Sequence, residues 1–222
     1  MVNRFDSREI LLVVDGSCVN NGRHDNGGRD PVGGCSFMFK SPPDGPDSGV
    51  PFATSFAGGG GGAGGGAAAG SSSGKIAFQL ERRGPRGAAL VATSNRAKLR
   101  VVIAALRFRA WGCEGWRRVV VLTDLMYVVE GATTLLPAWA ARRWLAKRKG
   151  GKIANRDLWE ELQASVEELR ETGCEVSFWL VVGGDGEQCG FIREVKEAAR
   201  SAARKNPDIV KEVFTELCGI MV

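Results

Sequence analysis

The feature that most constrains the fold is an apolar run near the start of the chain that leads into an acidic residue. Residues 10–14 read Ile-Leu-Leu-Val-Val, and Asp15 follows at once, before Gly16, Ser17 and Cys18. Five consecutive apolar residues predict a strand that is buried on both faces and lies in the middle of a sheet. We expect the strand to stop at Asp15, where a desolvated carboxylate needs a partner or a metal ion. Alternatively, Asp15 only caps a turn, because Asp-Gly-Ser is typical of turns.

The length and composition favour one domain that carries a large insertion. A chain of 222 residues can bury a full core, and residues 41–74 consist mainly of Gly, Pro, Ala and Ser. Such a segment buries too little apolar area to offset its ordering entropy, so we expect a disordered insertion. A phosphate-binding glycine loop is not favoured, because no strand leads directly into the segment. The expected domain covers residues 1–205, and residues 206–222 form a tail.

The net charge indicates the class of partner, and the cysteine pattern indicates the cellular compartment. The formal net charge of +5 favours a polyanionic partner. The six cysteines form no C-x-x-C pair, and the charged N-terminus lacks the apolar core of a signal peptide. These features predict reduced thiols and an intracellular protein of the cytoplasm or nucleus. No apolar run reaches membrane-spanning length, so no membrane partner is expected.

The pattern of apolar residues predicts an α/β domain. Strands are expected over residues 10–14, 33–40, 76–81, 118–123 and 175–182, and helices over 94–111, 125–131, 156–172 and 192–205. This order predicts a three-stranded meander followed by strands that are reached through helical crossovers. The strand over 118–123 also runs into an acid, Asp124. Two central strands that end in aspartates are typical of sites for paired divalent ions.

Several segments resemble the type 1 ribonucleases H, in particular their filamentous-fungal variants. They are V-V-D-G-S-C-V-N-N-G (13–22), G-G-C-S-F-M-F (33–39), F-Q-L-E-R-R-G-P (78–85), T-S-N-R-A-K-L-R-V-V-I-A-A-L-R (93–107), V-V-V-L-T-D-L-M-Y-V-V-E-G (119–131), N-R-D-L-W-E-E-L (155–162) and V-S-F-W-L-V (176–181). The resemblance implies a ribonuclease H-like fold, with a five-stranded mixed sheet flanked by helices. It also implies Mg²⁺-dependent hydrolysis of RNA in RNA–DNA hybrids by a monomeric domain.

The resemblance also implies that activity depends on four acidic residues, of which this sequence carries two. Asp15 matches the first and Asp124 the third. The second falls on Lys98, because the motif S-N-R-A-K-L fixes the register. The fourth meets R-E-V-K-E-A-A-R-S-A over residues 193–202, where Ala199 takes its place. Glu194 or Glu197 in the same segment is an alternative acid.

Lysine in place of a ligand carboxylate changes the local charge by two units. At 4 Å and an effective dielectric constant near 20, one unit-charge interaction amounts to roughly 4 kcal/mol. We therefore expect Lys98 to lie between Asp15 and Asp124 as an internal counter-ion, with weak or no binding of metal by the two aspartates. Alternatively, Lys98 turns towards solvent and a water-bound metal ion remains.

The residues that would read the nucleic acid match the family only in part. The resemblance implies contacts with 2′-hydroxyl groups across the minor groove, for which Cys18, Asn21 and Asn95 match the family. Ser94 is a shorter substitute, and Met126 replaces a glutamine. The family's proton-shuttling histidine is absent from the last loop, and the single histidine, His24, falls in the first hairpin turn.

A basic segment follows the helix that is expected over 125–131. Arg142, Arg143, Lys147 and Arg148 lie there with Trp139 and Trp144, where some family members place a basic protrusion that grips the DNA strand. Contacts with phosphates are one interpretation. The other is a solvated helix face above two core tryptophans.

Three functions are compatible with these residues. The first is a protein with impaired or lost hydrolysis that still binds RNA–DNA hybrid or double-stranded nucleic acid. The second is an active Mg²⁺-dependent endoribonuclease that uses Glu194 or Glu197 as a rearranged acid. The third is an interaction scaffold, or a decaying gene copy, without nucleic-acid contact.

Overall fold

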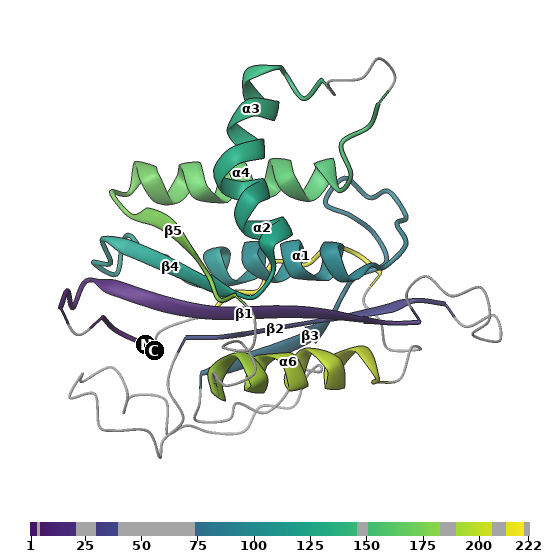
Figure 1. Cartoon of the computed structure of the whole chain (residues 1–222), viewed down its shortest axis with the longest axis horizontal. Helices are drawn as coiled ribbons and strands as arrows, with labels where there is room; N and C mark the ends of the chain where they lie inside the picture. The colour runs from purple at the N-terminus through teal and green to yellow at the C-terminus, as the bar shows by residue number, and fades with distance from the viewer. Residues whose placement is uncertain are drawn as a thin grey trace.

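A five-stranded mixed sheet forms the centre of the molecule (Figure 1). The computed structural model describes residues 1–3, 5–20, 30–39, 74–145, 151–182, 190–205 and 212–219. The strands are β1 (Glu9–Val19), β2 (Val32–Met38), β3 (Lys75–Gln79), β4 (Arg118–Thr123) and β5 (Glu175–Leu180), in the order β3-β2-β1-β4-β5. The first three strands form an antiparallel meander, and β4 pairs parallel with both β1 and β5. The predicted fold class is confirmed.

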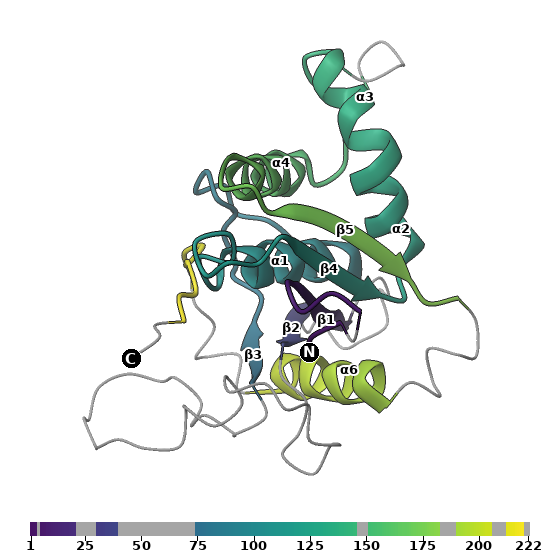
Figure 2. The same cartoon turned by 90° about the vertical axis from the view of Figure 1, so that its left-hand side faces the viewer.

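The helices cover the two faces of the sheet unequally. They are α1 (Ser94–Arg107), α2 (Met126–Glu130), the π-helical turn η2 (Gly131–Leu135), α3 (Leu136–Ala141), α4 (Arg156–Glu171) and α6 (Gly190–Ala203). Helices α1 and α4 lie on one face, and α6 lies on the other, where it packs against β1, β2 and β3 (Figure 2). Side chains of α6 also reach Leu122 of β4, but among the described elements no helix covers the part of this second face over β5, where Trp179 is exposed.

Strand β1 does not stop at Asp15, so that prediction is wrong. The strand continues to Val19, and its residues 15–19 pair with β2. The chain turns only at Asn20, which has a φ of 59°. Gly16 is required by close packing, because a Cβ atom there would lie 2.5 Å from the backbone of Ala97 in α1. A glycine that looked like part of a turn instead lets α1 approach β1.

The helices differ from their predicted ranges at several ends. Helix α1 ends at Arg107 rather than at residue 111, whereas the helix predicted over 125–131 continues through η2 into α3. Gly131 permits this course, because a Cβ atom there would overlap the indole ring of Trp159. Asn155 precedes α4 at the N-cap position without a side-chain capping bond, and its side-chain amide instead donates a hydrogen bond to the Tyr127 hydroxyl at 3.2 Å.

The main core lies between the sheet and helices α1 and α4. The apolar residues of α1 that face it at helical spacing, namely Leu99, Val102, Ile103 and Leu106, are all buried. A smaller cluster between the sheet and α6 contains Val13, Met38, Leu122, Ile192 and Val195. Trp139 and Trp144 are half-buried against the main core, which agrees with their interpretation as core residues.

The described part of the C-terminal tail packs against the domain. The Arg100 side chain is buried, pairs with Glu81 at 2.7 Å, and donates a hydrogen bond to the Thr215 carbonyl at 2.6 Å. The ring of Phe214 lies over the guanidinium of Arg100. Residues 212–219 thus close the side of the domain at which a buried ion pair would otherwise meet solvent.

The predicted disordered insertion over 41–74 lies almost entirely outside the described residues. At its end, Gly74 accepts a backbone hydrogen bond from Phe39, which joins the ends of β2 and β3. In the part of the chain that the structure describes, no helix is both long enough and apolar enough to cross a membrane.

Candidate functional site

The candidate site lies where β1 and β4 approach the second turn of α1. Asp15 projects from β1, and Asp124 follows the last residue of β4. The ammonium group of Lys98 on α1 lies 2.9 Å from Oδ1 of Asp15 and 2.8 Å from Oδ1 of Asp124. Lys98 is therefore shared by the two carboxylates, which is the position expected from the sequence.

The two contacts of Lys98 differ in geometry. Towards Asp124 the ammonium donates a hydrogen bond. Towards Asp15 it forms an ion pair at 2.9 Å whose geometry is poorly aligned for a hydrogen bond to the buried Oδ1. The charge of Lys98 and a hydrogen bond from the backbone of Gly16 both favour the ionised form of this buried carboxyl group.

The surroundings shift the pKa values of Asp15, Asp124 and Lys98 in different ways. Burial raises the pKa of Asp15, and the charge of Lys98 opposes this rise only in part. Burial also acts to raise the pKa of Asp124, but the hydrogen bond and charge of Lys98, together with Lys196, bring it below its usual value. Burial acts to lower the pKa of Lys98, yet the two carboxylates raise it overall. Lys98 is consequently a cation at neutral pH.

Helix α6 contributes a second ammonium group that the sequence motifs did not reveal. Nζ of Lys196 lies 3.4 Å from Oδ2 of Asp124, the oxygen that Lys98 does not bind. Glu194 pairs instead with Lys75 of β3 at 2.7 Å. Residues two apart lie about 200° apart around a helix, so Glu194 and Lys196 occupy opposite flanks of α6.

Ala199, which was predicted at the position of the fourth acid, lies in the contact between α6 and β2. It is completely buried, and its carbonyl oxygen would lie 2.1 Å from a Cβ atom on Gly34. Glu197, the other alternative acid, is exposed. Among the described residues, α6 brings only Lys196 to the two aspartates. The helical spacing of the buried residues Ile192, Val195 and Ala199 is the sequence signal that could have placed Lys196 on this flank.

The donor set does not fit a pair of divalent ions. Magnesium sites are built from carboxylate and other oxygen ligands, whereas this cluster holds two carboxylates and two ammonium groups. Nowhere in the described ranges do three or more His, Cys, Asp or Glu side chains gather in a way that could hold a metal ion. The positive charge that a metal would bring is already supplied by lysine.

The predicted groove-reading residues lie on neighbouring elements. Ser94 and Asn95 begin α1, where the Thr93 hydroxyl caps the helix by accepting a hydrogen bond from the amide of Arg96 at 3.1 Å. Cys18 lies near the end of β1, and Met126 is exposed at the start of α2. Asn21 and His24 lie outside the described residues.

Cys18 is expected to resist alkylation at neutral pH. Burial raises the pKa of its thiol to about 11 from a usual value of 9.0, which lowers the thiolate fraction at pH 8 by about 100-fold. Iodoacetamide labelling followed by peptide mass spectrometry should modify the exposed Cys113 well before Cys18. Labelling of Cys18 should rise steeply only as the pH approaches 11. Equal labelling of both residues at pH 8 would contradict this expectation.

The basic segment is described only in part. Arg142 and Arg143 are exposed just after α3, while Lys147 and Arg148 lie outside the described residues. Trp144 stacks near Trp139 and also lies under the guanidinium of Arg156. The tryptophans therefore anchor this end of the segment, and the two described arginines face solvent.

Comparison with known proteins shows the family. The model of the RNase H family matches residues 60–183, more than half of the chain. The ribonuclease H of Xanthomonas oryzae pv. oryzae is 39% identical over 85 residues, which cover 38% of this chain and 53% of that protein. Among solved structures, LC9-RNase H1, described as a type 1 RNase H with the type 2 active-site motif, is 27% identical. It superimposes with a TM-score of 0.53 over 88% of this chain and 72% of its own.

A foamy viral protease-reverse transcriptase in complex with RNA/DNA hybrid shares the fold, at 10% identity and a TM-score of 0.55. The likeness covers 89% of this chain and 20% of the viral one. The fold and the strand-end carboxylates thus define an RNase H-like domain. The chain belongs to the RNase H family. It spans about half the length of the first bacterial relatives that it matches.

Proposed function

We propose that this domain binds RNA–DNA hybrid or double-stranded nucleic acid and has lost metal-dependent hydrolysis. The observation that carries the proposal is the Lys98 ammonium group, which lies within 3 Å of both remaining acids, Asp15 and Asp124. The net charge of +5 supports a polyanionic partner. We also infer a type 1 domain of the fungal kind, monomeric and intracellular, in the cytoplasm or nucleus.

We assign the fourth acid position to Lys196 rather than to Ala199. Lys196 reaches Asp124 from the flank of α6 that faces the strand ends. The exposed fraction of the side chain is 32% for Lys196, 21% for Asp124, 14% for Lys98 and 3% for Asp15. The outermost charge of the cluster is therefore positive. A phosphate group can approach it without a metal ion, whereas a metal-free set of four carboxylates would repel it.

The active-enzyme alternative has less support. Glu194 is held by Lys75 on the opposite flank of α6, and using it as a metal ligand would require breaking that ion pair. The third function, an interaction scaffold that does not contact nucleic acid, has no support from any contact among the described residues. We therefore keep nucleic-acid binding as the proposed function.

A gel shift and a cleavage assay on one labelled RNA–DNA hybrid test the proposal. We expect a retarded complex whose affinity is the same in EDTA and in millimolar Mg²⁺, and no cleavage in either. The double variant Lys98→Glu/Lys196→Asp serves as the comparison, because it presents four carboxylates and should bind tightly only with Mg²⁺. Cleavage by the unmodified protein, or absence of any complex, would overturn the proposal.

The basic segment should contribute to binding through phosphate contacts. Replacing Arg142, Arg143, Lys147 and Arg148 by glutamine is expected to weaken affinity for the hybrid and to flatten its salt dependence. The slope of log K against log salt concentration should fall by roughly 0.7 to 0.9 for each phosphate that these side chains no longer neutralise. Binding isotherms at several salt concentrations measure the slope. An unchanged slope would remove this segment from the interface.

A further inference from the structure

The face of the sheet that carries α6 has an open part with an exposed tryptophan. Val13, Leu122 and Trp179 lie side by side on β1, β4 and β5. The first two are buried in the cluster that contacts α6. Trp179 lies one strand further out and is 59% exposed. A tryptophan this exposed on a sheet face offers a flat surface for a planar ligand.

The flank of α6 next to this open face carries a row of basic side chains. Arg193, Lys196 and Arg200 are spaced by three and four residues, which places them along one stripe of the helix, and Arg204 follows directly after the last residue of α6. Arg193 and Arg200 are exposed, and neither forms an ion pair with any described residue. From Arg193 to Arg200 the stripe is about 10 Å long at 1.5 Å per residue, and Arg204 extends the basic row beyond the end of the helix.

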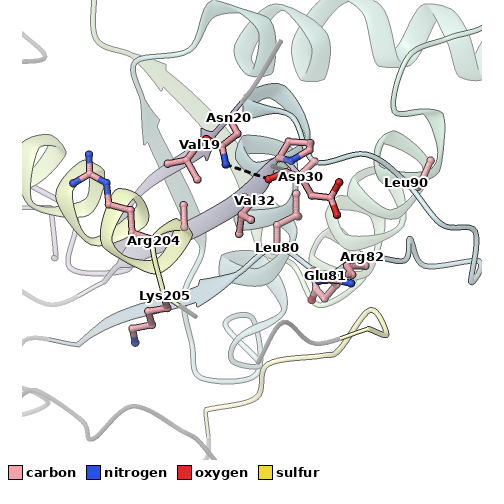
Figure 3. Close-up of a pocket in the computed structure, with 14 residues that line it drawn as sticks. Val19, Asn20, Asp30, Val32, Leu80, Glu81, Arg82, Leu90, Arg204 and Lys205 are labelled. Carbon is pink, nitrogen blue, oxygen red and sulfur yellow. Dashed lines mark hydrogen bonds between the residues drawn. The ribbon is translucent and has the colours of Figure 1, made fainter. Parts of the chain in front are cut away.

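The basic stripe runs from the candidate site to a pocket at the end of α6. Lys196 connects it to Asp124 of the candidate site. At its other end, Arg204 follows α6 and lines a pocket of about 700 Å³, together with Asn20 and Leu80 (Figure 3). In Figure 3, Arg204 and Lys205 project in different directions from the end of the helix.

The acids near this surface are largely neutralised. Glu9 and Glu175 both pair with Arg118 across β1, β4 and β5, and Asp124 holds two lysines. Glu197 is the one exposed acid of α6 that lies beside the stripe among the described residues. Because Lys196 is counted against Asp124, the three arginines of the stripe and Glu197 carry a net charge of +2, which complements a polyanion.

We propose that Trp179 and the basic stripe of α6 bind a single-stranded segment of nucleic acid. A row of cations that follows the backbone, next to an exposed aromatic ring that stacks on a base, is the combination that single-strand binding requires. The stripe is long enough to follow several phosphates of one strand. This surface lies on the opposite face of the sheet from α1 and α4, and Lys196 links it to Asp124 of the candidate site.

The test compares a blunt RNA–DNA hybrid with the same hybrid carrying an oligothymidylate extension. The extension is expected to increase affinity. Trp179→Ala should remove this increase and thereby lower affinity for the extended hybrid by about 5- to 100-fold. The affinity of Trp179→Ala for the blunt hybrid should stay unchanged. Arg193→Gln/Arg200→Gln should lower the salt slope for the extended hybrid by roughly 0.7 for each phosphate no longer neutralised. Phe5→Ala and Arg170→Gln, which alter an exposed aromatic and an exposed helix arginine elsewhere, are the matched controls.

The inference is overturned if the extension adds nothing, or if Trp179→Ala behaves like Phe5→Ala. It rests on the proposed function only in that both concern nucleic acid, and the two can fail separately. Binding of the extended ligand that depends on Trp179, without binding of the blunt hybrid, would reject the proposed hybrid site and keep this surface. Melting curves of each variant exclude loss of folding as the cause.

Discussion

Replacing Ala199 by aspartate is expected to lower the free energy of unfolding by at least about 4 kcal/mol. Ala199 is completely buried where α6 packs against β2, and the backbone of α6 lies so close to β2 that no Cβ atom would fit on Gly34. A carboxylate there would be buried without a partner, which is among the most destabilising changes that a single substitution makes. Urea denaturation measures the effect.

Lys196→Asp is the matched variant, since it adds the same side chain to the same helix. It should lower the free energy of unfolding by no more than about 2 kcal/mol, because this position reaches solvent. Mg²⁺ should reduce its cost, because the new carboxylate lies beside Asp124. If Ala199→Asp is tolerated and gains stability from Mg²⁺ while Lys196→Asp does not, the fourth acid position belongs to Ala199.

Lys98→Ala is expected to lower the free energy of unfolding by about 3 kcal/mol at neutral pH. The substitution leaves Asp15, which is almost fully buried, without its counter-ion. Lys196 still pairs with Asp124, so the loss is concentrated at Asp15. Thermal or urea denaturation measures the change, and Mg²⁺ should restore part of it by binding the freed carboxylates.

The pH dependence of stability gives a second check on Lys98. The pKa of Lys98 is raised in the folded protein, so its stabilising contribution is complete below its usual pKa of 10.5 and is lost as the pH rises through the higher folded value. The difference in stability between the unmodified protein and Lys98→Met, an uncharged variant of similar length, should therefore shrink in alkali. A difference that persists unchanged at high pH would show that Lys98 stabilises by packing alone.

The local sequence predicted the sheet and the identity of the three central groups. The apolar runs before Asp15 and Asp124 marked two adjacent strands, and the motif around Lys98 fixed its register in α1. The course of β1 beyond Asp15 was not predictable from local composition. Gly16 is a turn-forming residue type, and the reason for it, the backbone of Ala97 in a helix about eighty residues away, is a tertiary contact.

The contribution of α6 was not predictable for a different reason. The family motif has an acid at the fourth position, and counting along that motif leads to Ala199. The contact with Asp124 depends instead on which flank of α6 faces the strand ends, and that is set by the packing of Ile192 and Val195 against Val13 and Leu122. The exposure of Trp179 likewise depends on α6 stopping short of β5.

The most direct test of the central claim is the effect of Mg²⁺ on the melting temperature. The claim is that lysine ammonium groups occupy the place of metal ions at Asp15 and Asp124. We predict that millimolar Mg²⁺ leaves the melting temperature of the unmodified protein unchanged and raises that of Lys98→Glu/Lys196→Asp by several degrees. Equal stabilisation of both proteins by Mg²⁺ would contradict the claim.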